Sequence, residues 1–129
     1  MKFHASAIQL SSSGGEYFQV SLSESNQEHC PYVLLQNSFE FFRGPAYFEC
    51  HDLDLAGFDC IKRCELRNGS LDIDATDSAE HITVTFDEPN EKIGNLAWML
   101  RIIFAERVSF VNSSGISEIP IEDPDFEER

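Results

Sequence analysis

Apolar and polar residues alternate through most of this chain with a period of two, which is typical of β-strands that bury one face. The clearest alternation flanks Asn68-Gly69, a pair that tolerates the positive φ angles required by a two-residue type I′ turn. The runs on either side bring four apolar side chains to one face: Cys64, Leu66, Leu71 and Ile73. We therefore predict a β-hairpin over residues 60–74 with this face buried in the core.

The opposite face of the predicted hairpin is charged. A two-residue loop places Arg63 opposite Asp74 and Glu65 opposite Asp72, with Arg67 on the diagonal to Asp72. A slip of one residue would turn the leucines into water, so the register is strongly specified. The charged face then remains available to solvent or to a partner protein.

The same alternation predicts further strands at 17–22, 32–36, 46–50, 82–86, 108–111 and 116–121. Residues 2–10 are interpreted as one strand, with Phe3, Ala5 and Ala7 on one side and Ile8 and Leu10 on the other. Residues 11–15, Ser-Ser-Ser-Gly-Gly, consist of turn formers and predict a flexible connection.

One helix is predicted at about 89–106, where Pro89 suits the first turn and apolar residues recur with helical spacing. Trp98, Met99 and Ile102 lie outside the apolar stripe, so either another part of the chain covers them or a partner does. Gly94 costs about 1 kcal/mol against alanine in a helix, and the pattern does not explain it. The whole predicts an α+β fold: an antiparallel β-sheet with one main helix packed on it, in a single domain over 1–121 followed by a flexible acidic tail, 122–129.

Composition narrows the possible partners. The net charge of −14 disfavours nucleic acid and anionic membranes and favours either simple solubility or a basic protein partner. No apolar run reaches the roughly 20 residues that span a bilayer, and His4, Ser6 and Gln9 interrupt any signal-peptide core, so a cytoplasmic protein is expected. The four cysteines are then expected as reduced thiols, with Cys60 and Cys64 both on the core face of their strand.

The search for catalytic chemistry finds no phosphate loop, no zinc-protease motif and no nucleophile elbow. His51 has acidic neighbours in Asp52 and Asp54, and these three could form a general base or a metal site. Cys60 and Cys64 with Cys50 and His51 could in principle be zinc ligands, but buried cysteines are the preferred interpretation because no C-x-x-C pair is present. A solvated loop is the preferred interpretation. We therefore expect a protein that is not an enzyme and has no cofactor or bound metal.

From Tyr32 to Phe104 the order of segments resembles the Immunity protein 10 family of bacterial polymorphic-toxin systems. The residues that carry the resemblance are Tyr32 to Ser38, Tyr47-Phe48-Glu49, Gly57 to Ile61 with Arg63, the strands around Leu66 and Leu71, Ile82 to Phe86, and Arg101 to Phe104. Where members often have glycines after the aromatic residue, this chain has Asp59 and Cys60, and Leu53 replaces an expected polar residue.

The resemblance implies a cytoplasmic protein that binds and neutralises a cognate toxin, for example a basic nuclease. The expected docking surface combines the charged hairpin face with nearby loop acids: Asp52, Asp54, Asp59, Arg63, Glu65, Arg67, Asp72 and Asp74. An acidic secretion chaperone is the alternative, although such chaperones usually begin with a helix and this chain is expected to begin with a strand. A small metal-binding protein or enzyme around His51 is the third hypothesis.

Overall fold

The computed structural model describes residues 1–14, 16–25, 27, 29–38, 45–51, 56–76, 80–105 and 107–122. These residues form ten strands and one helix, α1 (Asn90–Phe104). The strands are β1 (Lys2–Ala5), β2 (Ala7–Ser13), β3 (Tyr17–Ser23), β4 (Tyr32–Ser38), β5 (Tyr47–Cys50), β6 (Gly57–Phe58), β7 (Ile61–Arg67), β8 (Ser70–Ala75), β9 (His81–Phe86) and β10 (Ser109–Asn112). The predicted α+β class is confirmed. No helix in the described part of the chain is long and apolar enough to cross a membrane.

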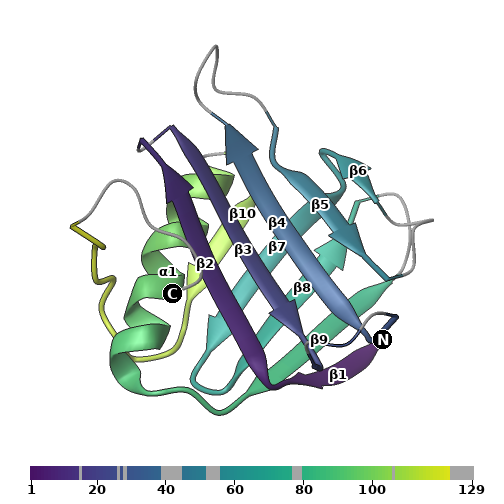
Figure 1. Cartoon of the computed structure of the whole chain (residues 1–129). Helices are drawn as coiled ribbons and strands as arrows, with labels where there is room; N and C mark the ends of the chain where they lie inside the picture. Colours follow the sequence, from purple (N-terminus) through teal and green to yellow (C-terminus); the bar gives the residue numbers. More distant parts are fainter. Residues whose placement is uncertain are drawn as a thin grey trace.

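The strands divide into two five-stranded sheets, one in front of the other in Figure 1. The meander sheet, β2-β3-β4-β5-β6, is antiparallel throughout. The hairpin sheet has the order β1-β9-β8-β7-β10, and its two edge strands pair in parallel, β1 with β9 and β10 with β7. The arrangement therefore goes beyond the single antiparallel sheet expected from the sequence.

The predicted single strand over 2–10 is wrong, because the chain changes sheets at Ser6. Phe3 and Ala5 are buried in β1, whereas the buried residues of β2 are Ile8, Leu10 and Ser12, so the alternation shifts by one position at the break. Each half buries its own inward face, and this explains why the apolar residues seemed to occupy two sides. Residues 11–13, expected in a flexible connection, extend β2 and pair with β3.

The Asn68-Gly69 hairpin forms with the predicted register in full, from Arg67 opposite Ser70 to Arg63 opposite Asp74. A register shift between Ile61 and Arg63 marks a β-bulge, and as a result Ile61 and Cys64 are both buried. Cys60 precedes the bulge and is only half-buried. Cys60 still packs against the core, as predicted, but it lies just outside β7 and is not fully buried as Cys64 is.

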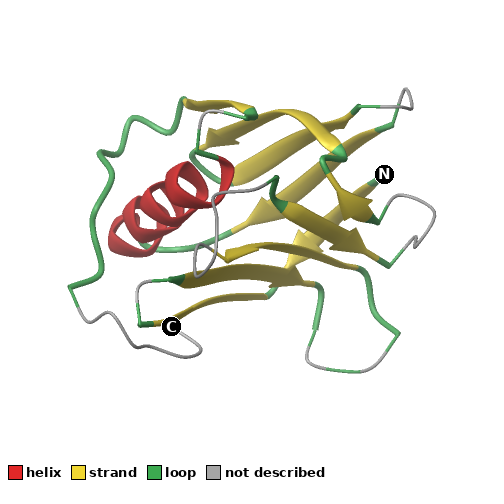
Figure 2. Cartoon of the chain, turned by 90° about the horizontal axis from the view of Figure 1, so that it is seen from above, coloured by secondary structure: helices red, strands yellow, loops and turns green. Residues whose placement is uncertain are grey.

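Helix α1 lies between the two sheets at one side of the molecule, as Figure 2 shows. Because both sheets cover the helix, its buried side chains occupy more of its circumference than one narrow stripe. The buried residues are Ile93, Gly94, Leu96, Ala97, Met99, Leu100, Ile103 and Phe104. Met99 is fully buried, and Trp98 and Ile102 pack partly buried against the same core. The indole of Trp98 meets the Phe18 ring edge-on, with 6.1 Å between the centroids. Another part of the chain thus covers these three residues.

The predicted strand at 116–121 is wrong; this segment forms no strand. It crosses α1 instead, where the amide of Ile119 donates a hydrogen bond to the carbonyl of Gly94 (3.0 Å). A β-carbon at position 94 would lie 2.5 Å from Ile119 Cδ1 and 2.9 Å from the Ser117 carbonyl oxygen. This close approach explains the glycine in the middle of the helix.

Candidate functional site

The outward side chains of β7, β8 and β9 form a charged surface, which we call the hairpin face. It comprises Arg63, Glu65, Arg67, Asp72, Asp74, His81 and Thr83. The pairing of β8 with β9 places Thr83 beside Asp72 and His81 beside Asp74. Five of the eight predicted docking residues therefore share one face.

Ion pairs connect the charges of the hairpin face. Glu65 accepts from Arg63 (3.0 Å) and from Arg67 (3.3 Å), and Arg67 also binds Asp72 at 2.7 Å. The predicted diagonal pair of Arg67 and Asp72 is confirmed, and Arg67 bridges the two like charges that face each other across the hairpin. Arg63 pairs along its own strand with Glu65, while Asp74 pairs with His81 rather than with Arg63 opposite.

Asp72 is the most buried member, with 8% of its surface exposed. It accepts from Thr83 Oγ1 at 2.7 Å and lies 2.9 Å from His81 Nε2. Burial by itself would raise the pKa of Asp72, but the hydrogen bonds from Thr83 and His81 and the charge of Arg67 outweigh it and lower the pKa. Asp72 is therefore an ionised side chain on β8 that binds side chains of both neighbouring strands, β7 and β9.

His81 lies between two carboxylates, with Nδ1 at 2.5 Å from Asp74 and Nε2 at 2.9 Å from Asp72. The hydrogen bonds to Asp74 and then to Asp72 raise the pKa of His81, because both stabilise the imidazolium. At Glu65 a hydrogen bond from Ser113, followed by the charges and hydrogen bonds of the arginines, lowers the pKa against the effect of burial. With His81 neutral, the three acids of the hairpin face exceed its two arginines by one charge, and a protonated His81 balances them.

The remaining predicted docking residues lie elsewhere. Asp59 is exposed in the turn that joins β6 of the meander sheet to β7 of the hairpin sheet, and it has a positive φ of 60°. Asp52 and Asp54 lie outside the described residues. The structure therefore brings five of the eight residues together and places a sixth in the turn between the sheets.

His51, the centre of the metal and general-base hypothesis, contacts Tyr32 at the start of β4. Its Nδ1 accepts the amide of Tyr32 at 3.2 Å, and its ring lies 6.1 Å from Phe3 and 6.4 Å from Tyr32 between centroids. None of the four cysteines forms a disulfide, and burial raises the pKa of the Cys64 thiol. Across the described ranges no three His, Cys, Asp or Glu side chains are grouped to hold a metal ion.

The meander sheet carries an outward surface that the sequence did not single out. We call it the tyrosine face and define it by Tyr17, Tyr32, Tyr47, Glu49 and Phe58. Glu49 Oε2 accepts from the Tyr32 hydroxyl at 2.6 Å, and Oε1 accepts from the Tyr47 hydroxyl at 2.7 Å. All three tyrosines of the chain lie here. A signal was present in the sequence, because each tyrosine is the first residue of its strand and precedes a buried apolar residue.

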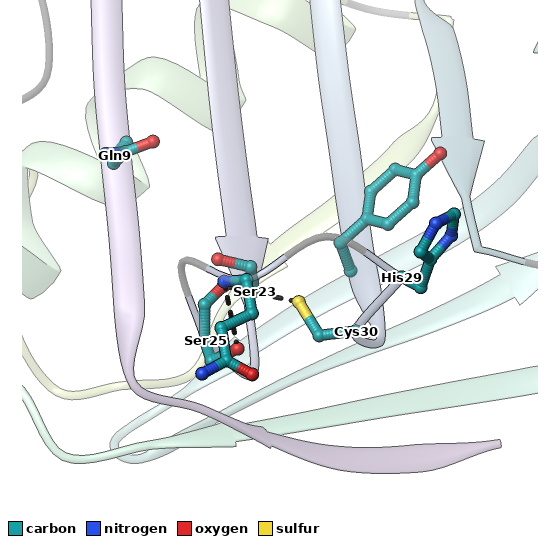
Figure 3. A pocket seen from close by; sticks show the side chains of 7 residues that line it. Gln9, Ser23, Ser25, His29 and Cys30 are labelled. Atoms are coloured by element: carbon teal, nitrogen blue, oxygen red, sulfur yellow. Dashed lines mark hydrogen bonds between the residues drawn. The ribbon is translucent and has the colours of Figure 1, made fainter.

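A hollow of about 500 Å³ opens at one end of the same sheet surface, where Tyr32 shares its lining with six other residues: Gln9, Ser23, Ser25, Gln27, His29 and Cys30. Figure 3 shows the Cys30 thiol turned toward Ser25, whose carbonyl oxygen accepts from it at 3.2 Å. These lining residues include no Asp, Glu, Lys or Arg. No family model, no curated protein and no solved structure matches this chain.

Proposed function

We propose that this protein is an immunity protein that neutralises a basic toxin by binding it stoichiometrically. The observation that supports the proposal most directly is the connected set of ion pairs on the hairpin face. Side chains that already hold one another lose less conformational entropy when a partner docks on them. The resemblance over Tyr32 to Phe104 supplies the class of partner.

The net charge of the whole protein and the charges of the hairpin face have different effects on toxin binding. The net charge of −14 attracts a basic toxin over a distance and raises the association rate. The hairpin face itself carries at most one net negative charge, so it contributes orientation and specificity through matched hydrogen bonds. Such bonds would pair toxin donors with the outward oxygens of Glu65 and Asp74, and toxin carboxylates with the exposed arginines.

The first test is functional. A toxin domain encoded by the neighbouring gene should kill an expression host, and co-expression of this protein should restore growth. Absence of rescue, together with no complex between the purified proteins, would reject the proposal. A secretion chaperone would instead be a dimer and would leave a folded toxin active, which light scattering and a toxin activity assay would reveal.

The second test addresses the face. Asp74 is more accessible than Asp72, and its reversal leaves the buried carboxylate intact, so Asp74→Lys is the better variant. We expect association with the toxin to slow roughly tenfold at low salt, with a flatter salt dependence. Glu91→Lys makes the same change of charge on the exposed start of α1 and serves as the control. Equal rates for the two variants would remove the hairpin face from the interface.

A further inference from the structure

The two sheets differ sharply in where they carry charge. The strands of the hairpin sheet contain seven charged residues: Lys2, Lys62, Arg63, Glu65, Arg67, Asp72 and Asp74. The strands of the meander sheet contain one, Glu49. Its other outward residues are mainly Tyr, Ser and Gln, a composition close to that of antibody binding loops, where Tyr provides rigid contact area and Ser adaptable hydrogen bonds. Glu49 is thus the one charged side chain in the strands of an otherwise uncharged sheet.

Glu49 is held in place but retains capacity to bind. Each carboxylate oxygen accepts one tyrosine hydroxyl, from Tyr32 and from Tyr47, and each has a second lone-pair position left. These two hydrogen bonds lower the pKa of Glu49 against the effect of burial, so the group is ionised at neutral pH. Among the described residues no Lys, Arg or His forms an ion pair with it. The anion is fixed in orientation, and no cation in the described part of the chain pairs with it.

Aromatic rings border this carboxylate. Tyr47 stands two residues before Glu49 on the same side of β5, and Tyr32 reaches it from β4. The Tyr47 ring meets Phe58 at 5.2 Å between centroids, and Phe58 leaves 66% of its surface in water. Tyr17 is fixed in turn by a hydrogen bond from its hydroxyl to Gln36 at 2.9 Å. The exposed Phe58 ring beside these ordered tyrosines offers flat apolar contact area to a partner.

We propose that the tyrosine face binds an arginine side chain of a partner protein, with Glu49 as the counter-ion and the rings of Tyr32, Tyr47 and Phe58 as its walls. The guanidinium is planar and can donate to both carboxylate oxygens at once, and it stacks on aromatic faces. A lysine ammonium is a strongly hydrated point charge and matches neither feature as well. The proposal rests on the proposed function only in taking the toxin as the protein that carries this arginine. The tyrosine face is then an alternative toxin interface to the hairpin face on the other sheet (Figure 1), and the Glu49→Gln and Asp74→Lys variants distinguish the two.

The arginine site can be tested without the toxin. We would titrate the full chain, labelled with nitrogen-15, with N-acetylarginine amide, with N-acetyllysine amide, and with the neutral isostere N-acetylcitrulline amide. Saturable shifts at the backbone amides of Tyr32, Tyr47 and Glu49 are expected for the arginine probe, with lysine at least about tenfold weaker and citrulline inactive. Glu49→Gln should abolish the response, and Glu91→Gln, the same charge change on α1, should leave it unchanged. Absence of saturation, or equal binding of all three probes, would overturn the proposal.

Phe58→Ala provides a second variant, since an exposed side chain can be removed without opening the core. It should weaken the arginine probe several-fold and leave the unfolding midpoint unchanged; unaltered affinity in a folded Phe58→Ala protein counts against the aromatic walls.

With the purified toxin, Glu49→Gln should weaken the complex at least tenfold relative to Glu91→Gln. An unchanged affinity for the toxin would overturn the assignment of this face to the partner. If the wild-type chain does not bind the toxin at all, the proposed function fails, while the small-molecule titration still decides whether the arginine site exists.

Discussion

Ile119 lies so close to Gly94 that a single added methyl group could not be accommodated without movement: a β-carbon there would stand 2.5 Å from Ile119 Cδ1. The Ile119 amide also donates to the Gly94 carbonyl at 3.0 Å. The C-terminal segment is thus attached to α1 at the residue that contributes least to helix propensity. At this position tertiary packing, and not helix propensity, determines which residue fits.

Gly94→Ala should therefore destabilise the protein, although alanine is the better helix former. Overpacking costs about 1–3 kcal/mol and exceeds the propensity gain of about 1 kcal/mol, because the Ser117 carbonyl cannot rotate away as a side chain could. Urea unfolding measures the difference. The loss should shrink in an Ile119→Ala background; a Gly94→Ala protein as stable as the wild type would contradict the account.

Asn37 and Asn95 allow the contribution of a buried hydrogen bond to stability to be compared with that of an exposed one. Each side-chain amide donates to a backbone carbonyl, Asn37 to Ile103 at 2.8 Å in the core and Asn95 to Ile119 at 2.7 Å at the surface. Asn37→Ala should cost about 1–3 kcal/mol, since it leaves the carbonyl near the end of α1 without this donor and away from water. Asn95→Ala should cost less than about 1 kcal/mol, because water can replace the amide. Equal losses in thermal or urea unfolding would show that burial does not decide the cost.

The hairpin face should make stability depend on pH around neutrality. The pKa of His81 is raised in the folded protein by the hydrogen bonds to Asp74 and Asp72, so its contribution is complete below its unfolded pKa near 6.5 and is lost as pH rises through the folded value. Because His81 is half exposed, we expect no more than about 1 kcal/mol. Unfolding free energies across this window should fall for the wild type and stay flat for His81→Gln.

Asp72 acts in the opposite direction. Its pKa is lowered on folding, so its stabilisation is present above the unfolded value of about 4 and disappears as pH falls through the lower folded value. Asp72→Asn should lose stability at neutral pH and converge with the wild type in acid. Parallel curves for the two proteins would contradict the role assigned to this carboxylate.

Glu49 should control the ionisation of its tyrosine neighbours. Burial and then the hydrogen bond to Glu49 raise the pKa of Tyr32 to about 12. Glu49→Gln removes the charge but not the burial, so the pKa of Tyr32 should fall while staying above 10. An ultraviolet absorbance titration of the phenols, with Glu91→Gln as the control, measures this change; overlapping curves would show that the carboxylate does not act on the ring.

Part of the site could be predicted because it depends on near neighbours in the chain. Arg63, Glu65, Arg67, Asp72 and Asp74 belong to two strands joined by two residues, so turn chemistry and alternation suffice to place them opposite one another. His81 comes from the next strand, and its meeting with Asp74 requires knowing that β9 pairs with β8. The tyrosine face draws on four strands and could not be assembled from any single segment.

What the sequence determined by itself was local: the buried face and the register of the hairpin at Asn68-Gly69, and the presence of one helix after Pro89. Period, turn residues and helical spacing suffice for these because the interactions that decide them lie within a few residues. Tertiary structure decided the division into two sheets at Ser6, the parallel edges β1 and β10, and the close contact between Gly94 and Ile119. Those features depend on how both sheets close around α1 to bury it, and no alternation pattern within one segment records which distant segment will cover it.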